Sequence, residues 1–209
     1  MGESYMGILN RESDEMVMKR LCGDAGHIVE MLKHVFTNQR GCDIRMALLF
    51  ASGLAGYSCH QAVKEEKGVF QVVKTNTGKK FYFGDEVNKY LLENPNSVTG
   101  LVNAVVDLPE KKVLELVSSF AENCGKDDML ICGFNPGTIY TQIRQCWEGI
   151  YGNMTSKYCK NPSEYPLLFG IVLQNILILS VKAGAPKGEA GEIAIEVANA
   201  ISKMDNDSF

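Results

Sequence analysis

Cys59 and His60 stand side by side in the chain, and a thiol beside an imidazole is the pair that a cysteine nucleophile and its base would use. Both residues fall in a segment predicted to be helical. Adjacent helical residues project about 100° apart, so the imidazole does not face the thiol. A base from elsewhere in the chain, such as His27 or His34, would be required. The competing interpretation is that Cys59 is a small buried side chain.

A second set of residues has the spacing of metal ligands on one helix. His27, Glu30 and His34 recur at i, i+3 and i+7 and lie along one side of a helix. A metal site needs partners from a second element, and the sequence identifies none. The three residues also lie away from the apolar stripe of Ile28 and Leu32, which favours a solvated face. We therefore predict no metal and no other cofactor.

Side-chain amides set among apolar neighbours are a third candidate. Gln61, Asn103, Gln174 and Asn175 belong to this group. A buried amide must find hydrogen-bond partners or cost of the order of 1 to 3 kcal/mol. The amides could converge on a polar pocket, or they could cap loops and bind one another.

Two predicted helix starts have free backbone N–H groups that could receive an anion. The first is at Gly84 and Asp85, and the second is at residues 135–138. Asp85 is predicted to cap the first helix, and the second start lacks the glycine spacing and the lysine of a phosphate loop. Capping is the favoured role at both places.

Cys59 and His60 would be positioned by one buried helix, predicted over residues 43–64 with Asp43 as its N-cap. This segment is apolar or small almost all the way round, as expected for a helix inside a core. One row of small side chains recurs along it at i, i+4, i+8 and i+11: Ala51, Ala55, Cys59 and Ala62. This row predicts a close approach by another helix.

The central helix is followed by a predicted β-hairpin. Gly68 ends the helical pattern, residues 69–75 alternate like a strand, and residues 80–83 form the second strand after a turn that contains Gly78. Two strands alone are marginal in water, so the hairpin must lay its aromatic face on helices. If a pocket exists, we expect it between the central helix and the hairpin. The candidate lining residues are Cys59, His60, Gln61, Asp85, Asn88, Asn103 and Asn175.

The rest of the sequence predicts further helices. They are expected near residues 13–23, 24–41, 85–95, 97–106, 108–125, 135–150, 166–181 and 188–204, with a short strand at 129–132 and a loop at 152–165. The predicted fold is α+β and predominantly α-helical, with helices packed around a central buried helix and one β-hairpin. We expect a single domain over residues 1–209.

Composition and cysteine usage indicate a cytoplasmic protein. Residues 1–10 lack the pattern of a signal peptide, a lipid anchor or a membrane anchor. The seven cysteines include no Cys-x-x-Cys pair, which argues against disulfides and a zinc knuckle. The apolar run at 166–181 is shorter than a membrane span. A net charge of −4 disfavours a nucleic-acid partner.

Two stretches of the chain resemble an uncharacterised family of bacterial proteins of about this size. They are residues 47–63, ALLFASGLAGYSCHQAV, and residues 78–93, GKKFYFGDEVNKYLLE. The resemblance implies a bacterial setting. It implies no activity and no functional residue, because no activity is known for such a family.

No set of residues assembles a nucleophile, a base and an oxyanion donor. We therefore expect a cytoplasmic, self-associating binding or scaffold-like protein without catalytic activity. Its expected partner is a second copy of the chain in a homodimer, with no nucleic-acid and no membrane partner. The alternative is a small-molecule-binding protein or an enzyme, with its pocket between the central helix and the hairpin.

Overall fold

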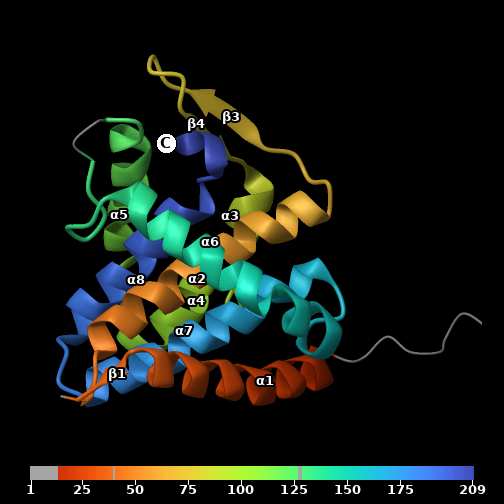
Figure 1. Cartoon of the computed structure of the whole chain (residues 1–209). Coiled ribbons are helices and arrows are strands. Elements are labelled where there is room, and N and C mark those ends of the chain that lie inside the picture. Colours follow the sequence, from red (N-terminus) through yellow and green to blue (C-terminus); the bar gives the residue numbers. More distant parts are fainter. Residues whose placement is uncertain (1–13, 40, 127–128) are drawn as a thin grey trace, which may run out of the picture.

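The computed structural model describes residues 14–39, 41–126 and 129–209. Within this part of the chain the fold is α+β and predominantly helical, as predicted (Figure 1). The α-helices are α1 (Asp14–Val35), α2 (Ile44–Glu65), α3 (Asp85–Leu91), α4 (Val98–Val106), α5 (Glu110–Asn123), α6 (Pro136–Asn153), α7 (Tyr165–Lys182) and α8 (Lys187–Ser202). The strands form two antiparallel pairs, β1 (Thr37–Asn38) with β2 (Gly41–Cys42) and β3 (Gln71–Lys74) with β4 (Lys80–Phe83). The expectation about residues 1–10 lies outside the described residues.

Helix α2 is the predicted central helix, and it is surrounded by α6, α7 and α8. Asp43 caps it, because the side-chain Oδ1 accepts a hydrogen bond from the backbone N–H of Met46 at 3.1 Å. The four small side chains of the predicted row are fully buried. Helices α2 and α8 approach closely at Gly56, where an added Cβ would lie 2.1 Å from the carbonyl oxygen of Ala198 in α8. Only glycine fits at this point of contact.

The first helix differs from the prediction, because α1 is continuous across Gly23 and Asp24. Both residues were expected at a break between two helices. Side chains at i, i+4, i+7 and i+11 form one buried stripe through that point, and its burial outweighs the cost of a helical glycine. The members of the stripe are Leu21, Ala25, Ile28 and Leu32. The helix ends at Val35, and the small β1–β2 hairpin follows, so Gly41 does not end the helix as predicted.

The predicted hairpin is confirmed as β3 and β4, with Val72 opposite Tyr82 and Val73 opposite Phe81. One face of β4 packs on helix α5, where the Phe81 and Phe120 rings are 6.0 Å apart. The predicted cap of α3 is wrong by one residue. Gly84 is the N-cap, with φ 145°, a conformation that glycine adopts readily, and Asp85 lies in the first turn.

Two short segments also differ from the prediction. The strand expected at 129–132 is a single bridge between Ile131 and Phe134. The loop expected at 152–165 is largely helical: α6 runs to Asn153, a π-helical turn covers Met154–Tyr158, and a 3-10 turn covers Pro162–Glu164. Met154 is buried, so this segment is part of the core.

Helix α7 is the predicted core helix. The expectation that this segment is too short for a membrane span is wrong: among the described residues, the segment 162–182 is long and apolar enough, because the helical segment begins before Pro166. However, 67% of its most apolar window is buried. Burial of this kind is compatible with a soluble protein. The chain then passes through α8 to a C-terminal tail, residues 203–209. The tail lies along β4, where the Tyr82 N–H donates to the carbonyl of Lys203 at 2.8 Å.

Candidate functional site

Cys59 is buried in the interior of the protein. Its side chain is fully buried, and its Sγ donates a hydrogen bond to the Ala55 carbonyl oxygen of the same helix at 3.3 Å. Burial raises the pKa of the thiol to about 12. A thiol in this environment is protonated at neutral pH, whereas a cysteine nucleophile needs the thiolate.

His60 lies under the hairpin, where two aromatic side chains cover it. Its ring stacks on Phe70 with 4.7 Å between centroids, and the edge of Tyr82 meets it at 5.4 Å. Nδ1 is 3.2 Å from the carbonyl oxygen of Ser202, and Nε2 is 3.6 Å from Oδ2 of Asp205. The space between α2 and the hairpin is therefore filled by aromatic rings at His60.

Asp205 holds the C-terminal tail against two helices. One carboxylate oxygen accepts from Lys64 Nζ at 2.7 Å, and the other accepts from the Tyr140 hydroxyl at 3.2 Å and from the Asn206 N–H at 2.8 Å. The neighbouring His60 ring, followed by Lys64 and Asn206, lowers the pKa of this carboxyl. Asp205 therefore favours the ionised form and links the tail to α2 and α6. Its 141-residue separation from Lys64 hid this contact from sequence reasoning.

Asn88, one of the predicted pocket residues, is a hydrogen-bond partner of Lys203. The Lys203 side chain is buried, and its Nζ donates to Oδ1 of Asn88 at 2.7 Å. Nζ also lies 6.0 Å from the centre of the Phe83 ring. Burial lowers the pKa of this amine to about 8, and the nearby Cys59 thiol acts in the opposite direction. Asn88 thus serves as the polar partner of a buried amine.

Within the described ranges, the side chains of the other candidate residues form no hydrogen bond with His60, Asn88, Lys203 or Asp205. Gln61 is half-buried on α2, and Asp85 is exposed at the start of α3. Asn175 donates to the Ile171 carbonyl of its own helix at 2.9 Å. Asn103 on α4 has a buried Oδ1 without a protein partner. The structure therefore brings Cys59, His60 and Asn88 into one region and leaves the remaining four apart.

The residues with metal-ligand spacing lie on the exposed side of α1. His27 and His34 are exposed, and Glu30 pairs with Lys33 at 2.8 Å. Across residues 14–39, 41–126 and 129–209, no three His, Cys, Asp or Glu side chains converge as metal ligands would. The start of α6 is capped as predicted, because Asn135 Oδ1 accepts from the Thr138 N–H at 3.2 Å.

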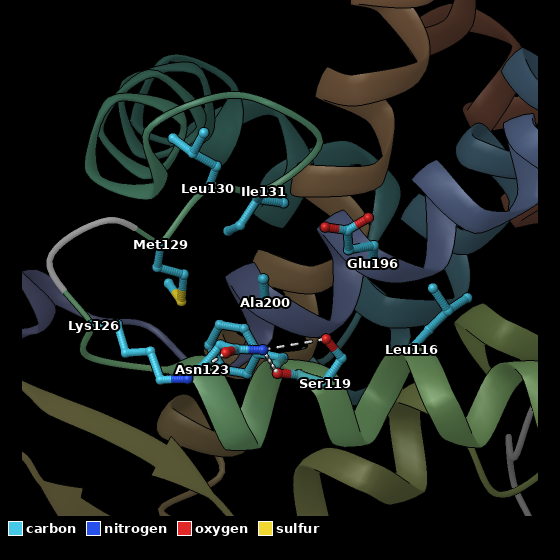
Figure 2. Close-up of a pocket in the computed structure, with 10 residues that line it drawn as sticks. Leu116, Ser119, Asn123, Lys126, Met129, Leu130, Ile131, Glu196 and Ala200 are labelled. Atoms are coloured by element: carbon cyan, nitrogen blue, oxygen red, sulfur yellow. Dashed lines mark hydrogen bonds between the residues drawn. The ribbon is translucent and has the colours of Figure 1, made fainter.

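A groove that the sequence did not predict lies between α5 and α8 (Figure 2). Its volume is about 400 Å³. Its lining residues are Leu116, Ser119, Phe120, Asn123, Lys126, Met129, Leu130, Ile131, Glu196 and Ala200. In the sequence, the groove could have been found only from the polar residues Ser119, Asn123 and Lys126, which are spaced along α5 and just beyond its end, beside its apolar stripe. Surface helices commonly show such spacing, so it does not distinguish a groove.

The outer strand of the hairpin is the second feature of interest. Val72 and Val73 project to opposite faces of β3 and are 51% and 47% exposed, and the preceding Val69 is 72% exposed. Within the described residues the sheet has two strands, so one edge of β3 has no partner strand. Strand β3 lies at the periphery of the molecule in Figure 1.

Comparison with protein-family models, with curated proteins and with solved structures finds no match for this chain.

Proposed function

We propose that this protein is a self-associating, non-catalytic binding protein, in which two copies pair through the outer edges of their β3 strands. The observation that carries the proposal is the half-exposed pair Val72 and Val73 on a strand with a free edge. Monomeric proteins usually protect such an edge with a charged side chain, proline, a bulge or a covering segment. Strand β3, with the sequence QVVK, contains no proline and no bulge, its one charged residue is Lys74 at the strand end, and no described residues pair with its outer edge.

The two edges of the hairpin are treated differently. The C-terminal tail lies along β4, where Tyr82 donates to the Lys203 carbonyl and Ser208 Oγ donates to the Lys80 carbonyl. Nothing comparable in the described chain covers β3. A second β3 strand would supply the missing backbone hydrogen bonds and turn two hairpins into a four-stranded sheet.

Charge complementarity favours a second copy of this chain as the partner. Glu86 lies at the beginning of the strand, where its Oε2 accepts from the Val69 N–H at 3.1 Å. Lys74 is exposed at the other end of the strand. A two-fold axis near Val72 would pair the strands antiparallel, as in an isologous dimer. Lys74 of each copy would then approach Glu86 of the other, while the two Lys74 side chains would lie far apart.

The non-catalytic part of the proposal is supported by the state of Cys59, the candidate nucleophile of the sequence analysis. Cys59 is buried and holds its proton, and Phe70 and Tyr82 cover the His60 ring beside it. An enzyme with its pocket between α2 and the hairpin therefore has less support. A cytoplasmic location fits the cysteines, all of which are free thiols, with Cys22 and Cys42 exposed.

Size-exclusion chromatography with light scattering tests the proposal. We expect the wild-type protein to have twice the 23.0 kDa mass of the chain. Val72→Lys should shift the protein to the monomer, because it places two like charges near the two-fold axis. Leu114→Lys is the matched control, since Leu114 is 57% exposed on α5, and it should leave the dimer intact. A monomeric wild-type protein would refute the proposal.

A further inference from the structure

The groove between α5 and α8 has the size of a small-ligand site and a lining that mixes apolar and polar groups. Its volume of about 400 Å³ lies within the range of pockets that bind small molecules. Leu116, Met129 and Leu130 supply partly exposed apolar surface, and Ser119 and Asn123 supply hydrogen-bonding groups. A ligand here would be partly apolar with polar ends.

The two charged groups of the groove lie at opposite ends (Figure 2), with Lys126 beyond the C-terminal end of α5 and Glu196 on α8 toward Leu116. The helical rise from Leu116 to Asn123 covers about 10 Å. The groove therefore has a positive end beside Asn123 and a negative end toward Leu116.

Neutral partners hold Glu196 in place. Its carboxylate accepts from the backbone N–H and from the Sγ of Cys132, both at 3.3 Å. Burial, followed by the proximity of Glu196, raises the pKa of the Cys132 thiol to about 12, so the thiol is a neutral donor. No cation of the described chain forms an ion pair with Glu196. A carboxylate has about four acceptor positions, so others remain for a ligand.

Lys126 is also held by a neutral group. Its Nζ donates to Oδ1 of Asn123 at 2.7 Å, and the Asn123 amide donates to the Ser119 carbonyl at 2.7 Å. An ammonium group has three donors. In the described residues Lys126 pairs with no carboxylate, and its remaining donors can bind an anionic group.

We infer that this groove binds a short peptide with free termini, oriented with its carboxylate at Lys126 and its ammonium group at Glu196. A single α-amino acid carries its two charges too close together to reach both residues. An extended chain covers up to about 3.5 Å per residue, so about three residues match the groove. Small apolar side chains would pack against Leu116, Met129 and Leu130.

Isothermal titration calorimetry with the tripeptide Ala-Leu-Ala tests this inference. The free peptide should bind the wild-type protein with a Kd of about 1 mM or tighter. Acetylating its N-terminus, or amidating its C-terminus, should each weaken binding about five-fold, because each removes one charge pair at a partly exposed site. These comparisons use the unaltered protein, so they do not depend on whether a variant folds.

Two variants assign each end of the peptide to its residue. Glu196→Gln should weaken binding of the free peptide about five-fold, and acetylating the peptide should then cause no further loss of affinity. Lys126→Met should also weaken binding of the free peptide about five-fold, and amidating the peptide should then cause no further loss of affinity. Glu115→Gln, on the exposed side of α5, is the matched control and should bind like the wild type. No binding at millimolar peptide, or equal binding of free and capped peptides, would overturn the inference.

Discussion

Replacing Gly56 by alanine should destabilise the protein strongly, because α2 and α8 meet there backbone to backbone. A Cβ at this position would lie 2.1 Å from the Ala198 carbonyl oxygen and 2.9 Å from its Cα. Ordinary van der Waals contact needs roughly 1 Å more, and main-chain atoms cannot move aside as a side chain can. The two helices would have to separate along their shared contact.

The magnitude follows from two opposing contributions. Overpacking a core costs about 1 to 3 kcal/mol and more where a backbone must shift, while alanine in place of a helical glycine contributes about 0.5 to 1 kcal/mol of stability. We expect the free energy of unfolding of Gly56→Ala to fall by about 2 kcal/mol or more. Urea unfolding followed by far-UV circular dichroism measures this change.

Two other helical glycines are matched controls for the same substitution. At Gly53 a Cβ would meet Cδ1 and Cγ1 of Ile143 at 2.7 Å, and a side chain can shift more easily than a main chain, so Gly53→Ala should cost less than Gly56→Ala. At Gly149 a Cβ meets nothing within 4 Å, so Gly149→Ala should stabilise by about 0.5 to 1 kcal/mol. If Gly56→Ala proves as stable as the wild type, or no less stable than Gly53→Ala, the proposed close packing of α2 on α8 is refuted.

Three further predictions concern Lys203, Asp205 and Cys59. The folded-state pKa of Lys203 is lowered to about 8, so the unfolded chain binds more protons than the folded protein between pH 8 and about 10.5. Relative to Lys203→Met, the free energy of unfolding of the wild type, measured in urea, should therefore rise by about 1 to 3 kcal/mol across this pH range. Equal dependence of the two proteins on pH would contradict this prediction. The pKa of Asp205 is lowered in the folded state, so its contribution is fully present above about pH 4 and is lost progressively as the pH falls toward the folded-state pKa. Asp205→Asn should therefore cost about 2 kcal/mol at pH 7 and progressively less below about pH 4, whereas a cost independent of pH would exclude the ionised form as the cause. The Cys59 thiol, with its pKa raised to about 12, should resist iodoacetamide at pH 8 until urea is added, while the exposed Cys22 and Cys42 react. Labelling of Cys59 in the folded protein, detected by peptide mass spectrometry, would contradict this prediction.

The sequence predicts the elements whose signals are local. The N-cap at Asp43 and the Asn135 cap before Pro136 are side chains that act on their own first turn, and both are confirmed. The hairpin follows from alternation and a turn with glycine, and it is confirmed as well. Two errors occur where burial outweighs a local signal, at Gly23 in α1 and in the segment around Met154. The cap of α3 is a local prediction that is wrong by one residue, because Gly84 takes the place expected for Asp85.

The site depends on contacts that no local signal contains. Asp205 meets Lys64 across 141 positions of the chain, and Glu196 meets Cys132 across 64. Neither partner has a spacing or a motif that connects it to the other. The interpretation of Cys59 as a small buried side chain could be reached from the sequence, because it depends only on where Cys59 and His60 point on their own helix.

Sedimentation velocity of two charge-reversed chains tests the proposed β3 interface most directly. Lys74→Glu places two acidic groups at each end of the paired strands, and Glu86→Lys places two basic groups there. Each variant alone should therefore dissociate more readily than the wild type. In an equimolar mixture both charge pairs are restored, and we expect a heterodimer of wild-type strength. If the mixture stays as dissociated as its components, or if the single variants dimerise like the wild type, then self-association through β3 is contradicted.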